Sequence, residues 1–275
     1  MRRDKAAPPV RLTVGYSTLP DRISSVRPAP WWNDVDVVVV LQTGGSHSMS
    51  AEALLAERDR LEGEGARTAE LDSIGVARSR NEVLRMAQTR YVLFCDDDVA
   101  VAIDSVQRMV ALMSAGGIAV GLGRAEDTNG RLRKNYSRRQ EPLTLFNSAK
   151  AATYEMVVDV ELTRKHGVWF DEEYGAGATN YLGDEYIFIV DALRAGLTAH
   201  AIPEVIATHP VESSGSRWGT REDIDARAAV LDRVFGRWSL LGKALFAARH
   251  RTRLGGMAGA WRLVRSTPRS RSLRR

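Results

Sequence analysis

The chain has 275 residues, 44% of them hydrophobic, which is enough for one large domain or for one domain with an appendage. No apolar run is long enough for a membrane-spanning helix. The N-terminal segment MRRDKAAPPVRL lacks the apolar stretch of a secretory signal, and Cys95 is the one cysteine of the chain. We therefore expect a reducing, cytoplasmic setting.

Positive charge is concentrated at the C-terminal end. The net charge is +5, but residues 243–275 carry ten Lys and Arg and no Asp or Glu. The remainder, with 29 basic and 34 acidic residues, is mildly acidic. This asymmetry predicts a tail that contacts an anionic surface, either a membrane or a nucleic acid. The alternative is a solvated and partly disordered end.

In the first third of the chain, strand patterns alternate with helix patterns. Residues 35–45 contain consecutive valines, typical of a parallel strand that is covered on both faces. Ser50 is a suitable N-cap for the helix that follows. The predicted elements are a strand at 10–19, a strand at 35–45, a helix at 50–65, a helix at 74–90 and a strand at 91–95. The alternation predicts an α/β sheet with right-handed crossovers.

Three aspartates, Asp96, Asp97 and Asp98, directly follow the apolar strand YVLFC. In open α/β sheets, ligands bind at the carboxyl ends of the strands. Asp96 and Asp98 alternate along an extended chain, so both can point to one side and offer oxygen ligands to Mg²⁺ or Mn²⁺. The alternative is a solvated acidic loop in which one aspartate caps the next helix.

The middle of the chain predicts a hairpin at 117–136, with Asn129 and Gly130 in its turn. A strand, a glycine-rich loop and a helix that begins at Asp184 follow. A last strand at 198–210 ends in His209, and the chain beyond Ser213 has a helical pattern. We expect an α/β domain at 10–212 and a basic helical extension at 213–275.

Several segments, taken together and in this order, resemble the family 2 glycosyltransferases of the GT-A fold. They are GVARSRNEVLRMAQTRYVLFCDDDV, with its D-x-D motif, HGVWFDEEY, and LGDEYIFIVDALRAGLTAHAIPEVIATHP. The resemblance implies a Rossmann-like, mixed, mostly parallel sheet flanked by helices. The chain departs from the family in two places: the acidic pair is Asp184-Glu185 instead of Glu-Asp, and the first strand ends in GYSTLPDR.

The family resemblance implies transfer of a sugar, with inversion, from a UDP- or dTDP-sugar to an acceptor hydroxyl. The process expected is synthesis of cell-surface polysaccharide or glycolipid. The acceptor hydroxyl needs a general base, which is Glu185 or Asp184, with Glu185 favoured. For Asp184 the alternative role is an N-cap of its helix.

The resemblance also implies a donor site and a metal site. The residues expected to bind the nucleotide sugar are Thr18, Asp21, Arg22, Gln42, Arg80, Asn81, Asp96 and Asp97. The residues expected to bind Mn²⁺ or Mg²⁺ are Asp96, Asp98 and His209. A helix-start salt bridge is the alternative for Arg80 and Asn81. Trp169 and Tyr181 are candidates for stacking on an acceptor sugar, although buried aromatics are commoner.

Within the basic tail, apolar residues at 240, 241, 244, 245 and 248 fall at helical spacing among basic ones. This pattern suits a helix on an anionic membrane surface, where a saccharide or lipid-linked acceptor would be presented. We expect a peripheral protein at the inner membrane face, with oligomer formation open. Other interpretations are a metal-dependent nucleotidyltransferase, a phosphatase of the haloacid-dehalogenase type and a non-enzymatic nucleic-acid binder.

Overall fold

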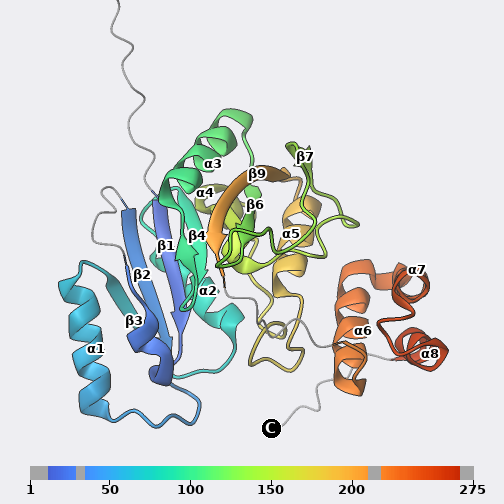
Figure 1. The fold of residues 1–275 in the computed structure, drawn as a ribbon, viewed down its shortest axis with the longest axis horizontal. Coiled ribbons are helices and arrows are strands. Elements are labelled where there is room, and N and C mark those ends of the chain that lie inside the picture. The colour runs from blue at the N-terminus through green and yellow to red at the C-terminus, as the bar shows by residue number, and fades with distance from the viewer. Residues whose placement is uncertain (1–11, 29–34, 210–217, 267–275) are drawn as a thin grey trace, which may run out of the picture.

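The structure, a computed structural model, describes residues 12–28, 35–209 and 218–266. Within these residues nine strands form one sheet in the order β3-β2-β1-β4-β8-β6-β9-β5, and β7 also pairs with β9 (Figure 1). The strands are β1 Leu12–Thr18, β2 Val35–Gln42, β3 Arg67–Leu71, β4 Tyr91–Asp96, β5 Ala100–Val101, β6 Val120–Glu126, β7 Glu141–Pro142, β8 Met156–Asp159 and β9 Ala199–Thr208. The four pairings β1–β2, β1–β4, β2–β3 and β6–β9 are parallel, and the antiparallel pairings are shorter. The predicted mixed, mostly parallel sheet is confirmed.

Helices flank the sheet and continue beyond it. They are α1 Ala51–Gly63, α2 Val76–Met86, α3 Ile103–Gly116, α4 Val160–Lys165, α5 Asp184–Arg194, α6 Arg221–Phe235, α7 Ser239–His250 and α8 Met257–Arg265. The short 3-10 turn η2 Thr153–Glu155 directly precedes β8. Ser50 caps α1 as predicted, because its side chain accepts a hydrogen bond from the backbone N–H of Ala53 at 3.2 Å.

The alternation of side chains along β2 places valines in two separate cores. Val37 and Val39 belong to the cluster that contains apolar residues of α1 and α3. Val38 and Val40 belong to the cluster that contains apolar residues of α2 and α5. Since successive side chains of a strand point to opposite faces, both faces of β2 are covered, as its unbroken valine run predicts.

Several parts of the prediction differ from the structure. The strand β3 was not expected, because RTAEL has no apolar run. Among the described strands it lies at the edge of the sheet and pairs with β2 alone, and four of its five residues are half-buried. The acidic cluster therefore follows the fourth strand of the chain and not the third. The short helix α4 was not expected either. The predicted hairpin keeps its turn, but its second arm pairs only through the bridge between Glu126 and Leu132.

The helical extension packs through α6 against the α/β domain, and α7 and α8 lie farther out (Figure 1). Val230 and Val234 of α6 share a cluster with α5 residues such as Ile187 and Val190. Gly236, with φ 51° and ψ −123°, ends α6, so the helical pattern predicted beyond Ser213 is divided between α6 and the helices that follow it. A second cluster joins α6, α7 and α8 to one another.

Substituting Gly15 should destabilise the fold. A Cβ atom at Gly15 in β1 would clash with the methyl groups of Val83 in α2. Overpacking of this kind costs about 1–3 kcal/mol, so Gly15→Ala should lower the free energy of unfolding by that order in denaturant titrations. The double variant Gly15→Ala/Val83→Ala should show a smaller loss than the sum of the single changes. Equal stability of Gly15→Ala and wild type would contradict the close packing of α2 on β1.

Candidate active site

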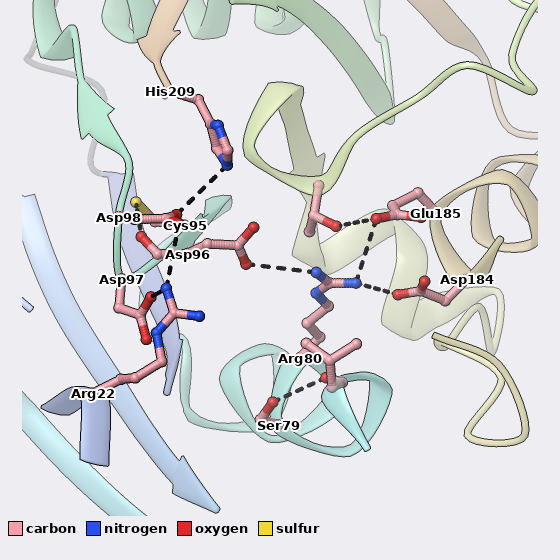
Figure 2. A network of polar contacts seen from close by, with 12 residues as sticks. Arg22, Ser79, Arg80, Cys95, Asp96, Asp97, Asp98, Asp184, Glu185 and His209 are labelled. Atoms are coloured by element: carbon pink, nitrogen blue, oxygen red, sulfur yellow. Dashed lines mark hydrogen bonds and ion pairs between the residues drawn. The ribbon is translucent and has the colours of Figure 1, made fainter. Parts of the chain in front are cut away.

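The three aspartates at the end of β4 have different partners (Figure 2). Asp96 faces Arg80, with 3.7 Å between its Oδ1 and Nη2 of the guanidinium. Asp97 is paired with Arg22 and accepts a hydrogen bond of 3.0 Å from the Thr18 hydroxyl. The cluster therefore lies at the carboxyl end of a strand as predicted, but its carboxylates spread in different directions.

Asp98 lies toward the last strand of the sheet. Its Oδ1 is 3.6 Å from Nε2 of His209, the residue that follows β9, and its Oδ2 is 3.3 Å from Arg22. The antiparallel pairing of β5 with β9 brings these two segments together, because Ala100 is paired with Thr208. Residues more than a hundred positions apart thus meet at one edge of the sheet.

Arg80 is the centre of the site and lies between the aspartate cluster and the acidic pair of α5 (Figure 2). Its side chain is 6% exposed. It donates a hydrogen bond to Asp184 and lies 3.6 Å from Glu185, as well as facing Asp96. One buried cation therefore balances carboxylates from two distant segments, which lowers the cost of burying all of them.

The two acids at the start of α5 have opposite pKa shifts. Burial, followed by the neighbouring charge of Glu185, raises the pKa of Asp184 to about 7. Burial also disfavours the charge of Glu185, but Arg80 and the hydrogen bond from Thr153 outweigh it and lower the pKa of Glu185. Below about pH 7 the pair therefore holds its proton on Asp184, while Glu185 stays charged.

The side chain of Glu185 is 19% exposed and that of Asp184 is 4% exposed. The N-cap position of α5 is occupied by Gly183, and no side chain caps the helix, so the alternative role of Asp184 as N-cap is wrong. Of these two acids, Glu185 is the one that combines an ionised carboxylate with access to the site. This favours Glu185 as the proton acceptor.

Burial raises the pKa of Asp96, and the charge of Arg80 opposes that rise. Burial likewise raises the pKa of Asp97, against the effect of Arg22. Crowded carboxylates with raised pKa values are typical of sites that take up a cation or a cationic group. Asp96 and Asp97 therefore have partners within the site, while the Asp98 side chain is 41% exposed.

Three further predicted donor-binding residues, Gln42, Asn81 and Asp21, also have partners within the protein. Gln42 donates a hydrogen bond of 2.9 Å to the carbonyl of Gly75, at the start of α2. Asn81 both donates to and accepts from the backbone of Phe170, at 3.0 Å and 2.9 Å. Asp21 accepts hydrogen bonds from Ser48, which lower its pKa. These contacts fix the loops around the site, and a role in donor binding stays a prediction for all three.

The metal site also stays a prediction. Within the described ranges no three His, Cys, Asp or Glu side chains converge on one point. Asp98 and His209 lie side by side and are of the types that Mn²⁺ accepts, whereas Asp96 is turned toward Arg80. Asp98 and His209 are therefore the two residues of the predicted set that remain as candidate ligands of a divalent cation.

Two residues of the site were not predicted from the sequence. The hydroxyl of Thr153 donates a 2.5 Å hydrogen bond to Glu185, and the ring of Tyr154 stacks on His209 at 4.7 Å between centroids. Both belong to η2 within the unremarkable segment AATYEM, so only their position in the fold reveals them.

The glycine-rich loop before α5 is packed closely around the acidic pair. Gly175, with φ +98°, lies so close to Asp184 that a Cβ would be 2.8 Å from its carboxyl carbon. Gly183, with φ +89°, packs on Val230 of α6 in the same way. Only glycine fits both the backbone conformation and the space at these two positions.

The family model "Glycosyl transferase family 2" matches residues 15–163. None of the curated proteins compared with the chain matches it. Among solved structures, S. aureus TarS is 15% identical with a TM-score of 0.60, and the alignment covers 88% of this chain and 43% of TarS. The chain thus spans less than half of TarS.

Residues 1–349 of S. aureus TarS in complex with UDP-GlcNAc give a TM-score of 0.61 at 15% identity, over 88% of this chain and 73% of that one. The complex with UDP gives a TM-score of 0.58 at 16% identity, over 88% and 72%. At these identities the likeness establishes the fold. The family match covers more than half of the chain, including the aspartate cluster and Arg80. The chain belongs to glycosyl transferase family 2 and has the GT-A fold.

Proposed function

We propose that this glycosyltransferase moves a sugar, with inversion, from a UDP- or dTDP-sugar to an acceptor hydroxyl in the synthesis of cell-surface polysaccharide or glycolipid. The observation that carries the proposal is Arg80, which joins the strand-end aspartates to the acidic pair of α5. The UDP-GlcNAc and UDP complexes of the similar TarS fold support a uridine donor. Family membership favours this reaction over nucleotidyl transfer, phosphate-ester hydrolysis and nucleic-acid binding.

The reaction needs a base on one side of the sugar and charge stabilisation on the other. Glu185 takes the proton of the acceptor hydroxyl as the hydroxyl oxygen bonds to the anomeric carbon and the bond to the diphosphate breaks. Thr153 and Arg80 hold the Glu185 carboxylate in place. Arg22 is 51% exposed and lies beside the aspartates, which suits a role in contacting the diphosphate.

Asp98 and His209 would hold Mn²⁺ or Mg²⁺. A cation bound there would supply Lewis acidity toward the charge that develops on the leaving diphosphate. Asp96, whose side chain is 35% exposed beside Arg80, remains available to the nucleotide sugar, whereas Asp97 is 5% exposed and would act by holding Arg22 and Thr18 in place.

The helix α7 supports peripheral membrane association. Its outward face carries Leu240, Leu241 and Leu245, which are 64%, 56% and 58% exposed, and Arg249 and Arg251 near its end are exposed too. None of the described helices has the length and apolar composition to cross a bilayer. An apolar face beside basic groups suits a helix that lies on an anionic surface at the inner membrane face.

Lys243 is an exception among the basic residues of this helix. It is 4% exposed, and its Nζ is 2.6 Å from Asp232 of α6. The expectation that Lys243 faces the membrane is therefore wrong, because its ammonium group is buried and paired with Asp232 inside the extension. The two exposed arginines and the apolar face remain the groups that would contact lipid.

Glu185→Gln should lower the release of UDP from UDP-GlcNAc or UDP-glucose by roughly 100-fold or more, because the base is lost. Its affinity for UDP should be unchanged in thermal-shift titrations with Mn²⁺.

Asp98→Asn should weaken the Mn²⁺-dependent part of UDP binding, whereas Asp104→Asn, at the start of α3, should resemble wild type. Full turnover in Glu185→Gln, or no stabilisation of the wild type by UDP or dTDP, would count against the proposal.

Asp184→Asn should flatten the pH dependence of stability. The pKa of Asp184 is 3.8 in the unfolded chain and about 7 in the folded one, so the folded state alone keeps this proton in between. The free energy of unfolding therefore falls as pH rises through this window. Denaturant titrations from pH 5 to 8 should show a smaller fall in Asp184→Asn, while Asp127→Asn, at an exposed turn, keeps the wild-type fall. If the free energy of unfolding fell equally with pH in both variants, the pKa of Asp184 could not be raised.

The double variant Leu241→Glu/Leu245→Glu should lose co-sedimentation with anionic phosphatidylglycerol vesicles at low salt, because its face becomes acidic and polar. Leu132→Glu, which changes a leucine that is 49% exposed at the turn after β6, is the control and should still sediment. The wild type should be partly released by high salt, since screening weakens the arginine contacts. Failure of the wild type to bind these vesicles would overturn the membrane role of α7.

A further inference from the structure

A cavity of about 660 Å³ lies between the glycine-rich loop, α6 and α8. Its walls include Thr179, Asn180 and Tyr181 of the loop, and Asp225 and Trp261 of the helices. We propose that this cavity binds a neutral saccharide segment of the acceptor. The inference rests on the proposed function and gives it an acceptor site built jointly by the α/β domain and the helical extension.

The cavity shares the loop that ends at the acidic pair. Tyr181 lies three residues before Asp184, and Gly175 at the other end of the loop packs directly on the Asp184 side chain. The loop is closed by two backbone hydrogen bonds: Gly175 donates to the carbonyl of Asn180 at 2.8 Å, and Asn180 donates to Glu173 at 3.1 Å. A ligand on the outer side of this loop is therefore connected to the proposed base by a few fixed residues.

The lining has the mixed chemistry that sugars require. Tyr181 and Trp261 offer aromatic surface to the C–H faces of a sugar ring, and Trp261 is 59% exposed. Asn180 and Thr179 offer donors and acceptors for sugar hydroxyls. The walls thus combine two aromatic rings with many polar and charged side chains, a mixture that suits a hydroxyl-rich ligand.

The charges around the cavity cancel, which favours a neutral ligand. Glu222 and Asp225 stand against Arg262 and Arg265. Arg262 is engaged with Asp225 at 2.8 Å, and the Arg265 guanidinium lies 3.7 Å from the centroid of the Trp261 ring. Arg265 thus covers one face of the indole and leaves the other for a ligand.

The same contacts hold the walls in place. The pair of Arg262 with Asp225 ties α8 to α6, and Ser266 adds a hydrogen bond of 3.3 Å to Asp225. Ala226 and Ala229 form the α6 side, where small residues leave the space open. A cavity with fixed walls loses little conformational entropy when a ligand binds.

The test is binding of the full chain to an array of immobilised neutral and acidic oligosaccharides, in the presence of UDP and Mn²⁺. The wild type should be retained by neutral glycans. Trp261→Ala, which removes the platform, and Ala229→Phe, which fills the space, should each lose roughly tenfold or more of that signal. Trp238→Ala, which removes a tryptophan that is 60% exposed outside the cavity, should bind like the wild type.

Stabilisation by UDP in a thermal-shift assay, measured on the same four proteins, separates this inference from the proposed function. The cavity variants should be stabilised as much as the wild type, because the donor site is elsewhere. Three results would overturn the inference if UDP still stabilises the protein. They are no retention of the wild type on any glycan, retention by acidic glycans alone, and retention of both cavity variants at the level of the wild type. A wild type that binds neither glycans nor UDP would overturn the proposed function as well.

Discussion

The site depends on one buried guanidinium. Arg80 is 6% exposed, and burying a charge to this extent is costly unless opposite charges and hydrogen bonds surround it. The carboxylates that do so come from the end of β4 and the start of α5, which the fold must bring together before the charge is compensated. The same ion pairs separate the pKa values of the acidic pair. Arg80 lowers the pKa of Glu185, whereas burial raises the pKa of Asp184.

Residues of the family motifs divide into two groups in the structure. Arg80, Asp98 and Glu185 face the site. The side-chain amide of Asn81 is instead hydrogen-bonded to the backbone of Phe170. The neighbours Arg80 and Asn81 on one helix therefore do different work: one balances charge and the other anchors the segment that leads to the glycine-rich loop. A motif read from the sequence combines such roles without separating them.

The sequence predicts the regular core well, because apolar runs and caps are local signals. The valines of β2 and the Ser50 cap are examples. It does not predict β3, whose five residues lack an apolar run, or the contact of Thr153 with Glu185, which joins residues 32 positions apart. The direction in which each aspartate points was also beyond prediction, because strand alternation ends where β4 gives way to a turn.

The helix α6 is buried on two sides. Val230 and Val234 meet α5, while Ile224, Ala228 and Leu231 meet α7 and α8, and Arg233 is paired with Asp171 and Asp191. Such a helix has little solvent-facing surface on which substitutions can accumulate. Sequence drift within this extension is therefore expected to be slowest in α6, the reverse of the ordinary view that a peripheral appendage varies freely.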